Sequence, residues 1–320
     1  MAYLDWDDSE KAVPVAIVNG GERNGKIVYL HDDEELMVSS KAPFTPQEKS
    51  LLNSIIEEVC KRNNCGYRDR LKKSTVLKRA LNAGIAPKDP ELHDLFKQIK
   101  ETFKQERVGY IEIEEGQFNY IPKIEGRECI YICAPSGSGK SWWCKQYAMQ
   151  YNKLFPDRKI FLFSKVDDDE SLEGIQNITR VPLDEGFLAM ELESSDECFH
   201  QSLCIFDDTD TVRDNEVKKE IIQLKNDILE TGRHNTVHIL ITSHMISNYK
   251  ETRIVLNEAH KLVVYGSSGS TQQIKYVLDR YWGYDKITID NIIKMRSRWV
   301  MCNKIAPQYY MGQRAIRLIR

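Results

Sequence analysis

The sequence predicts an α/β fold with a doubly wound, mainly parallel β-sheet, and the distribution of its apolar residues is the main reason. From residue 128 onward, short apolar runs alternate with stretches of helical pattern, at residues 129–134, 159–164, 201–207, 237–243 and 261–266. This alternation is typical of a parallel sheet with helices on its faces. The sequence has no repeat of fixed period, so solenoids and propellers are excluded.

The composition is that of an ordinary globular chain with room for about two domains. The 320 residues are 41% hydrophobic and include 15 Tyr and 10 Phe, which excludes general disorder and a collagen-like chain. No apolar run approaches the roughly 20 residues that cross a bilayer, and the opening MAYLDWDDSE is acidic where a signal peptide is basic. We therefore expect no integral membrane segment and no secretion.

The eight cysteines indicate a reducing compartment such as the cytosol. None is arranged as C-x-x-C, and Cys129, Cys133 and Cys204 lie within apolar, strand-like runs. Buried and reduced thiols are therefore expected in place of a disulfide framework.

Charge and pattern divide the chain into four segments. Residues 1–40 form an acidic β-hairpin segment, and residues 41–107 form a small helical domain with the basic stretch YRDRLKKSTVLKRALNAGI. Together they make a small mixed α+β N-terminal domain. Residues 108–285 contain the main sheet, and residues 286–320 form a basic, β-rich C-terminal tail with eight basic residues and one acid. The basic helical stretch and the basic tail are each interpreted either as a DNA-binding surface or as an ordinary solvated face.

A phosphate-binding loop is predicted directly after the first strand. The sequence there matches G-x-x-x-x-G-K-[ST], with alanine in place of the first glycine. Gly137 and Gly139 let the backbone curl so that successive N–H groups point at phosphate oxygens, beside the positive end of the next helix. Lys140 is expected to bridge the β- and γ-phosphates, and Ser141 to bind the accompanying Mg²⁺. The alternative is a glycine- and serine-rich turn before a helix. The predicted nucleotide-binding residues are Ala134, Pro135, Ser136, Gly137, Ser138, Gly139, Lys140, Ser141 and Trp142.

A second part of a nucleotide site is predicted where the apolar run LCIFDD ends in two carboxylates. Asp207 is expected to hold Mg²⁺, directly or through water, as in a Walker B motif. Asp208 is placed to orient or deprotonate the attacking water. Taken alone, the aspartate pair also fits a helix cap or a loop. Together with the phosphate loop it predicts a P-loop NTPase that binds ATP or GTP, and the expected cofactors are ATP and Mg²⁺.

The strand KIFLFS lies between these two motifs, an order typical of P-loop ATPases in which a neighbouring strand presents a polar sensor to the γ-phosphate. The strand VHILITS ends in Ser243, and His244 follows. Either side chain is a candidate sensor, although a histidine at a strand end is often an ordinary surface residue. We expect one of the two to face the nucleotide.

The chain resembles the genome-packaging ATPases of poxviruses and other large DNA viruses, a branch of the FtsK/HerA superfamily. Four segments carry this resemblance: IFLFS, LCIFDDTD, LETGRHN and VHILITSHMISNYK. The resemblance covers roughly residues 129–281. Its most specific part is the double aspartate combined with the Gly-Arg-His-Asn segment at 232–235. His244 departs from the family, whose sensor strand usually carries glutamine.

The resemblance implies a homo-oligomeric ring, a pentamer or hexamer, that threads double-stranded DNA into a preformed capsid and hydrolyses ATP at subunit interfaces. It implies that Arg233 completes the nucleotide site of a neighbouring subunit, and Arg213 and Arg253 are the other candidates for this role. The alternative for Arg233 is a salt bridge at the end of a helix. Capsid proteins are then expected partners, and the host cytoplasm or the virion the expected location. Two other functions stay open: a related DNA translocase or helicase in replication or segregation, and a nucleotide-gated scaffold without rapid turnover.

Overall fold

The computed structural model describes residues 2–8, 12–32, 46–83, 86–165, 172, 174–247, 252–266 and 270–319. The chain divides into two compact units. The first unit consists of residues 1–5 and 31–111, and the second of residues 6–30 and 112–320.

The first unit contains three helices, as the apolar periodicity predicts. They are α1 (Pro46–Arg62), α2 (Tyr67–Ala83) and α3 (Pro90–Val108), and a short strand, β1 (Ala2–Asp5), belongs to the same unit. The helices bury one apolar cluster in which Ile56, Leu77 and Ile99 have no exposed surface. The predicted boundary near residue 40 lies outside the described residues.

The second unit begins with the predicted hairpin. Strands β2 (Val13–Asn19) and β3 (Ile27–Asp32) pair antiparallel, and β5 (Gln117–Tyr120) pairs antiparallel with the other edge of β2. Strand β4 (Tyr110–Glu112) spans the boundary between the two units. Residues 33–40 of the predicted acidic segment lie outside the described part of the chain.

The main sheet of the second unit confirms the predicted α/β class. Each of the five predicted strands is present, as β6 (Cys129–Cys133), β7 (Ile160–Ser164), β9 (Leu203–Asp207), β10 (His238–Ser243) and β11 (Lys261–Val264). They stand in the order β11–β6–β10–β9–β7 and all run parallel. Every residue of these strands is buried, as expected of a sheet covered on both faces.

Besides β4, which forms one edge of this sheet, four further strands extend it beyond the sequence prediction. Strand β8 (Ile178–Pro182) adds in parallel to β7, and its single buried residue explains why the sequence does not reveal it. On the other side, β12 (Val300–Asn303), β13 (Tyr309–Gly312) and β14 (Ala315–Leu318) follow β11 as antiparallel strands. The basic C-terminal segment is therefore β-rich, as predicted, but its strands belong to the main sheet and a helix, α9 (Lys286–Lys294), precedes them.

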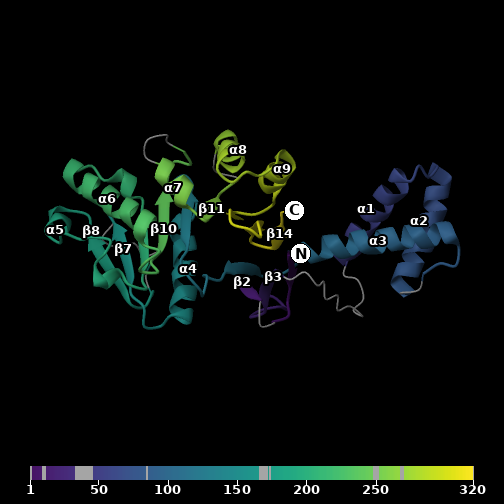
Figure 1. The fold of residues 1–320 in the computed structure, drawn as a ribbon, viewed down its shortest axis with the longest axis horizontal. Coiled ribbons are helices and arrows are strands. Elements are labelled where there is room, and N and C mark those ends of the chain that lie inside the picture. The colour runs from purple at the N-terminus through teal and green to yellow at the C-terminus, as the bar shows by residue number, and fades with distance from the viewer. Residues whose placement is uncertain are drawn as a thin grey trace. The chain divides into compact units, whose positions relative to one another are not determined.

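Helices connect the parallel strands and lie beside the sheet (Figure 1). They are α4 (Lys140–Leu154), α5 (Glu185–Leu188), α6 (Asn215–Thr231) and α7 (Arg253–Glu258), with 3-10 turns η2 (Glu197–Phe199) and η3 (Thr209–Thr211). A further helix, α8 (Thr271–Arg280), follows the last parallel strand, β11. After β6 the chain crosses to β7, past β10 and β9, whereas after β10 it crosses to β11 on the far side of β6. Ligands of such folds bind in the crevice where neighbouring strands send their connections in opposite directions. That crevice lies at the carboxyl ends of β6 and β10.

Seven of the eight cysteines are buried as free thiols, as expected, and Cys198 is half-buried. Within the part of the chain that the structure describes, no helix combines the length and the hydrophobicity that a bilayer crossing requires.

A buried polar network joins several elements at the amino edge of the parallel strands. The carboxylate of Glu128, just before β6, forms an ion pair with Lys261 at the start of β11. It also accepts hydrogen bonds from Tyr120 and Tyr147, and the Tyr147 hydroxyl lies 3.0 Å from Nδ1 of His238. This network fixes β6, β10, β11 and α4 relative to one another at the edge opposite the crevice.

His238 makes the stability of this unit dependent on pH. Burial lowers the pKa of its imidazole to about 4, despite the favourable charge of Glu128. Since this pKa lies below the ordinary value of 6.5, the unfolded state binds more protons between the two values. The free energy of unfolding is therefore expected to fall as the pH drops from 6.5 to 4, by about 3 kcal/mol from this group.

The measurement is chemical unfolding of the full chain at several pH values, for the wild type and for His238→Gln. The variant should lose stability less steeply over the same range, because glutamine does not titrate. Equal slopes in the two proteins would show that His238 contributes nothing to the pH dependence.

Candidate functional site

The predicted phosphate loop forms a tight turn between β6 and α4. Gly137 and Gly139 have φ angles of 73° and 106°, in the region of positive φ that favours glycine, and Gly139 is the N-cap of α4. The loop therefore ends at a helix N-terminus, where backbone N–H groups without helical partners attract anions.

Other residues of the chain donate hydrogen bonds to the carbonyl groups at the end of this loop. The Gly139 carbonyl accepts hydrogen bonds from the Tyr265 hydroxyl at 2.8 Å and from the Trp143 N–H at 3.1 Å. The Ser138 carbonyl accepts one from Nε of Arg298 at 3.0 Å. Tyr265 follows β11 and Arg298 precedes β12, so residues distant in sequence fix the loop conformation. Ser141 is half-buried and Trp142 is 37% exposed.

Of the two predicted aspartates, Asp207 is the last residue of β9 and Asp208 follows it. A threonine of the neighbouring strand β10 forms hydrogen bonds with both. The Thr242 hydroxyl donates to Oδ1 of Asp207 at 2.7 Å, lies 3.1 Å from Oδ1 of Asp208, and accepts from the Asp208 backbone N–H at 2.8 Å. Asp208 has φ 45° and ψ 36°, a left-handed conformation that is uncommon for a residue other than glycine. Thr242 thus holds a strained backbone that turns the second carboxylate toward the crevice.

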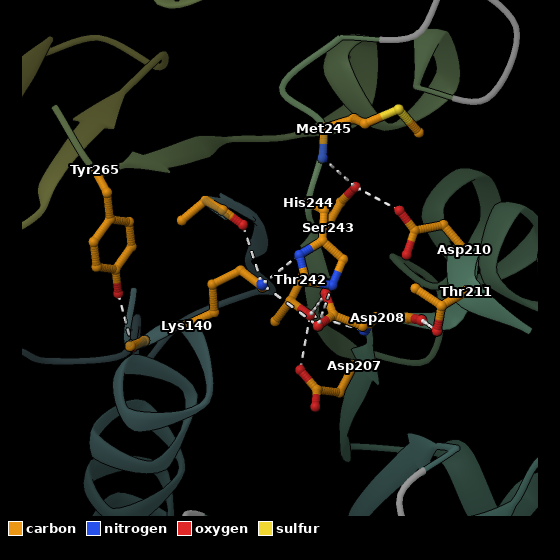
Figure 2. Close-up of polar contacts among 12 residues, drawn as sticks. Lys140, Asp207, Asp208, Asp210, Thr211, Thr242, Ser243, His244, Met245 and Tyr265 are labelled. Carbon is orange, nitrogen blue, oxygen red and sulfur yellow. Dashed lines mark hydrogen bonds and ion pairs between the residues drawn. The ribbon is translucent and has the colours of Figure 1, made fainter. Parts of the chain in front are cut away.

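Lys140, Asp208 and His244 meet at the switch point of the sheet (Figure 2). Nζ of Lys140 lies 3.4 Å from Oδ2 of Asp208, 3.2 Å from Nδ1 of His244 and 3.1 Å from the Ala134 carbonyl oxygen. Nε2 of His244 lies 3.0 Å from the same Oδ2. Because an ammonium group only donates, Nδ1 accepts from Lys140, and the neutral Nε2–H tautomer then donates to Asp208. The three side chains therefore satisfy one another.

Ser243, the alternative sensor candidate, faces a different partner. Its hydroxyl donates to Oδ2 of Asp210 at 2.9 Å and accepts from the Met245 backbone N–H at 3.1 Å (Figure 2). Neighbouring residues at a strand end point to opposite sides, and here only His244 is directed at Lys140. The other oxygen of Asp210, Oδ1, is buried and has no hydrogen-bond partner among the described residues.

The structure does not bring Arg233 to this cluster. Arg233 lies between α6 and the start of β10, at the amino edge of the sheet, whereas the phosphate loop is at the carboxyl edge. Its side chain is exposed and forms no ion pair with a residue that the structure describes. Arg213, before α6, and Arg253, at the start of α7, are exposed and follow β9 and β10 at the carboxyl edge.

The oxygen donors near the loop fit Mg²⁺. This ion takes one or two protein oxygens together with water and phosphate oxygens, and the Ser141 hydroxyl and the Asp207 carboxylate are ligands of that kind. Asp207 is buried, which limits competition from bulk water. In the described part of the chain, no group of three or more His, Cys, Asp or Glu side chains is arranged to hold a metal ion.

Sequence reasoning missed four residues of this site. Thr242 could have been found from the sequence, because it is a hydroxyl residue inside an otherwise apolar, buried strand. Asp210 stands two residues after the aspartate pair. Tyr265 and Arg298 had no local signal, because they reach the loop from β11 and β12, which lie far away in the sequence.

Comparison with solved structures finds a viral genome-packaging NTPase and a conjugation coupling protein among similar proteins. The genome packaging NTPase B204 from Sulfolobus turreted icosahedral virus 2, in complex with AMPPCP, is 13% identical, with 60% of this chain and 97% of that chain covered and a TM-score of 0.40. The pCW3 conjugation coupling protein TcpA with ATPγS is 8% identical, with 94% of this chain and 77% of that chain covered and a TM-score of 0.43. The fold assignment itself rests on the strand order and the loop geometry described above.

Comparison by sequence gives a closer relationship. No family model matches the chain. "Uncharacterized protein V3" of Sputnik virophage is 41% identical over 201 residues, which are 62% of this chain and 79% of that protein. An identity of this size over most of the relative shows common descent. The chain therefore belongs to the same family as protein V3 of Sputnik virophage.

Proposed function

We propose that this protein is an ATPase that translocates double-stranded DNA and packages a viral genome into a preformed capsid. The ATPase part is carried by one observation, the meeting of Lys140, Asp208 and His244 beside a phosphate loop at the switch point of the sheet. The packaging part is supported by the sequence resemblance and by kinship with a virophage protein.

In this proposal the ammonium group of Lys140 has two alternative sets of partners, the side chains of Asp208 and His244 and the phosphates of a nucleotide. The ammonium group is held by Asp208 and His244, and the phosphates of a nucleotide compete with both for it. When Lys140 turns to the phosphates, Oδ2 of Asp208 loses a cationic partner and Nδ1 of His244 loses a donor. Nucleotide binding therefore changes the state of the two groups that stand next to the γ-phosphate position.

Asp208 is the proposed general base. Once Lys140 has turned away, Oδ2 is available to accept a proton from the attacking water, and the Nε2–H of His244 keeps the carboxylate oriented. Thr242 fixes the other oxygen. His244 is accordingly the proposed γ-phosphate sensor, and Ser243 supports the strand end through Asp210.

Mg²⁺ would be held by Ser141 and Asp207 and would neutralise charge on the phosphates. The strained turn at Asp208 separates the tasks of the two aspartates, since Asp207 stays buried in the strand while Asp208 faces the crevice.

We further propose that the protein works as a homo-oligomeric ring whose subunits share their sites, with capsid proteins as partners and the host cytoplasm or the virion as location. An arginine from a neighbour would complete each site. Arg233 remains the candidate from the sequence resemblance, while Arg213 and Arg253 share the edge that carries the phosphate loop.

The experiment measures ATP hydrolysis by the full chain with and without double-stranded DNA, and binding of labelled ATP. DNA is expected to stimulate turnover. Lys140→Ala should weaken ATP binding at least tenfold, on the order of one charge-assisted hydrogen bond. Lys153→Ala is the matched control, since Lys153 is an exposed lysine in the last turn of the same helix, and it should bind as the wild type does.

The results separate the competing functions. Unchanged ATP affinity in Lys140→Ala would remove the basis of the ATPase proposal. ATP binding without any DNA-stimulated turnover would favour a nucleotide-gated scaffold. Stimulated turnover together with binding to empty capsids supports packaging, whereas turnover without capsid binding favours a translocase or helicase in replication or segregation.

A further inference from the structure

Arg298 contacts the phosphate loop from the C-terminal part of the chain, 160 residues away in sequence. Its Nε donates to the Ser138 carbonyl at 3.0 Å. A Cβ atom added to Gly139 would lie 3.1 Å from Nη2 and 3.4 Å from Cζ of Arg298. The guanidinium therefore packs against Gly139, a loop residue without a side chain that stands directly before Lys140.

The charged end of Arg298 has unused hydrogen-bonding capacity. An arginine side chain has five N–H donors, and Nε accounts for one. Across the residues that the structure describes, no acceptor binds Nη1 or Nη2, and Arg298 is exposed. Four donors in a planar fork, a geometry that suits phosphate oxygens, are thus available beside a loop that binds phosphate.

The backbone of Arg298, in contrast, is held in place. Its N–H donates to Oε1 of Gln313 at 3.0 Å, in the turn between β13 and β14, and the Gln313 N–H donates to the Ser297 hydroxyl at 2.9 Å. The next residue, Trp299, is buried, and its ring packs edge-on against that of Trp143 in α4. Because its backbone is fixed and its guanidinium is available, Arg298 would lose little conformational entropy on binding an anion.

A purely structural role explains only part of this arrangement. One neutral donor would satisfy the Ser138 carbonyl, so the contact alone does not require a guanidinium. Lys140, the other cation of the loop, is buried and held by Ala134, His244 and Asp208. Arg298, in contrast, is an exposed cation beside Ser138 and Gly139 of the loop.

We propose that Arg298 is a second cationic ligand of the nucleotide, which binds oxygens of the polyphosphate through Nη1 and Nη2 in the same subunit. This inference rests on the nucleotide site of the proposed function. Because Arg298 is anchored to the turn between β13 and β14, nucleotide binding also becomes linked to the basic C-terminal strands.

The test is equilibrium binding of a fluorescent ATP analogue to the full chain with Mg²⁺, at several KCl concentrations. Arg298→Ala is expected to weaken binding about tenfold, within the range of hydrogen bonds to charged groups. It should also reduce the dependence of affinity on salt, because one ion pair with the phosphates is lost. Arg298→Lys should lie between the two proteins, since it keeps the charge and loses the fork.

Arg296→Ala is the matched control. Arg296 is exposed, lies two residues away and has no ion pair with any residue in the described ranges, so its replacement should leave both the affinity and the salt dependence unchanged. Without nucleotide, the thermal unfolding midpoint of each variant should stay close to that of the wild type, because Arg298 is exposed and its side chain makes one hydrogen bond to the described residues.

Two results would overturn the inference. Wild-type affinity in Arg298→Ala would show that the guanidinium does not reach the nucleotide. Equal weakening in Arg298→Ala and Arg298→Lys, with an unchanged salt dependence, would show that Arg298 only supports the loop. In both cases a normal loss of binding in Lys140→Ala would leave the proposed ATPase function standing, whereas failure of the wild type to bind ATP would remove the function itself.

Discussion

Replacing Asp208 with asparagine is expected to lower ATP turnover about 10³-fold while ATP binding is retained. Asparagine has nearly the same shape and tolerates the left-handed backbone found at this position, so the local fold should persist. It cannot accept a proton from water, however. It also removes the anion that holds Lys140, so ATP affinity should be no weaker than in the wild type.

The measurement is steady-state hydrolysis in the presence of DNA, together with direct binding of labelled ATP. Asp214→Asn is the matched control. Asp214 lies six residues further on and caps α6 by accepting hydrogen bonds from the N–H groups of Glu216 and Val217, a role that asparagine fills equally well. Full turnover in Asp208→Asn would contradict the assignment of the general base and direct attention to Asp210, whose Oδ1 has no partner among the described residues.

The sequence could predict the parts of this site that depend on local pattern. Strand β6, the loop glycines and Lys140 are contiguous, and the loop geometry follows from where glycine permits a positive φ. The double aspartate ends a fully apolar run, so its position at a strand tip is also a local property. Five of the six parallel strands were predictable for the same reason, since each of the five is buried on both faces, whereas β8 has a single buried residue.

The choice between Ser243 and His244 could not be made in this way. Both stand at the end of β10, and which of them faces Lys140 depends on the register of β10 against β6 and β9. Register is a property of the assembled sheet. The role of Arg298 was even less predictable from the sequence, because its contact with Ser138 requires three antiparallel strands to extend the sheet past β11.

Glu128→Gln is expected to cost about 3–5 kcal/mol of the free energy of unfolding, the range for breaking a buried ion pair at one partner. Although burial by itself raises the pKa of Glu128, the Lys261 ammonium and the other partners hold it at about 2, so the carboxylate is ionised. Glutamine keeps the shape and the acceptor for Tyr120 but removes the charge. Lys261, whose side chain is only 8% exposed, is then left without its carboxylate partner.

The thermal unfolding midpoint measures this cost, and a drop of roughly 10 °C is expected for a unit of this size. Asp290→Asn serves as the matched control, since the Lys275–Asp290 pair, at 3.0 Å, lies at the surface with an exposed lysine and a half-buried aspartate. Exposed pairs contribute at most about 1 kcal/mol, so the control should barely move. A Glu128→Gln midpoint no lower than that of Asp290→Asn would show that the buried pair is not a stabilising element.

A double variant separates the value of the pair from the cost of leaving one charge alone. Glu128→Gln combined with Lys261→Met removes both charges, and most of the lost stability should return, because apolar replacement of a whole buried pair is often neutral. Since the pair lies at the amino edge of the sheet, opposite the phosphate loop, the double variant should also keep its affinity for ATP. Restored stability with weakened ATP binding would mean instead that the charged network sets the relative positions of β6, β10 and β11 on which the meeting of Lys140 and His244 depends.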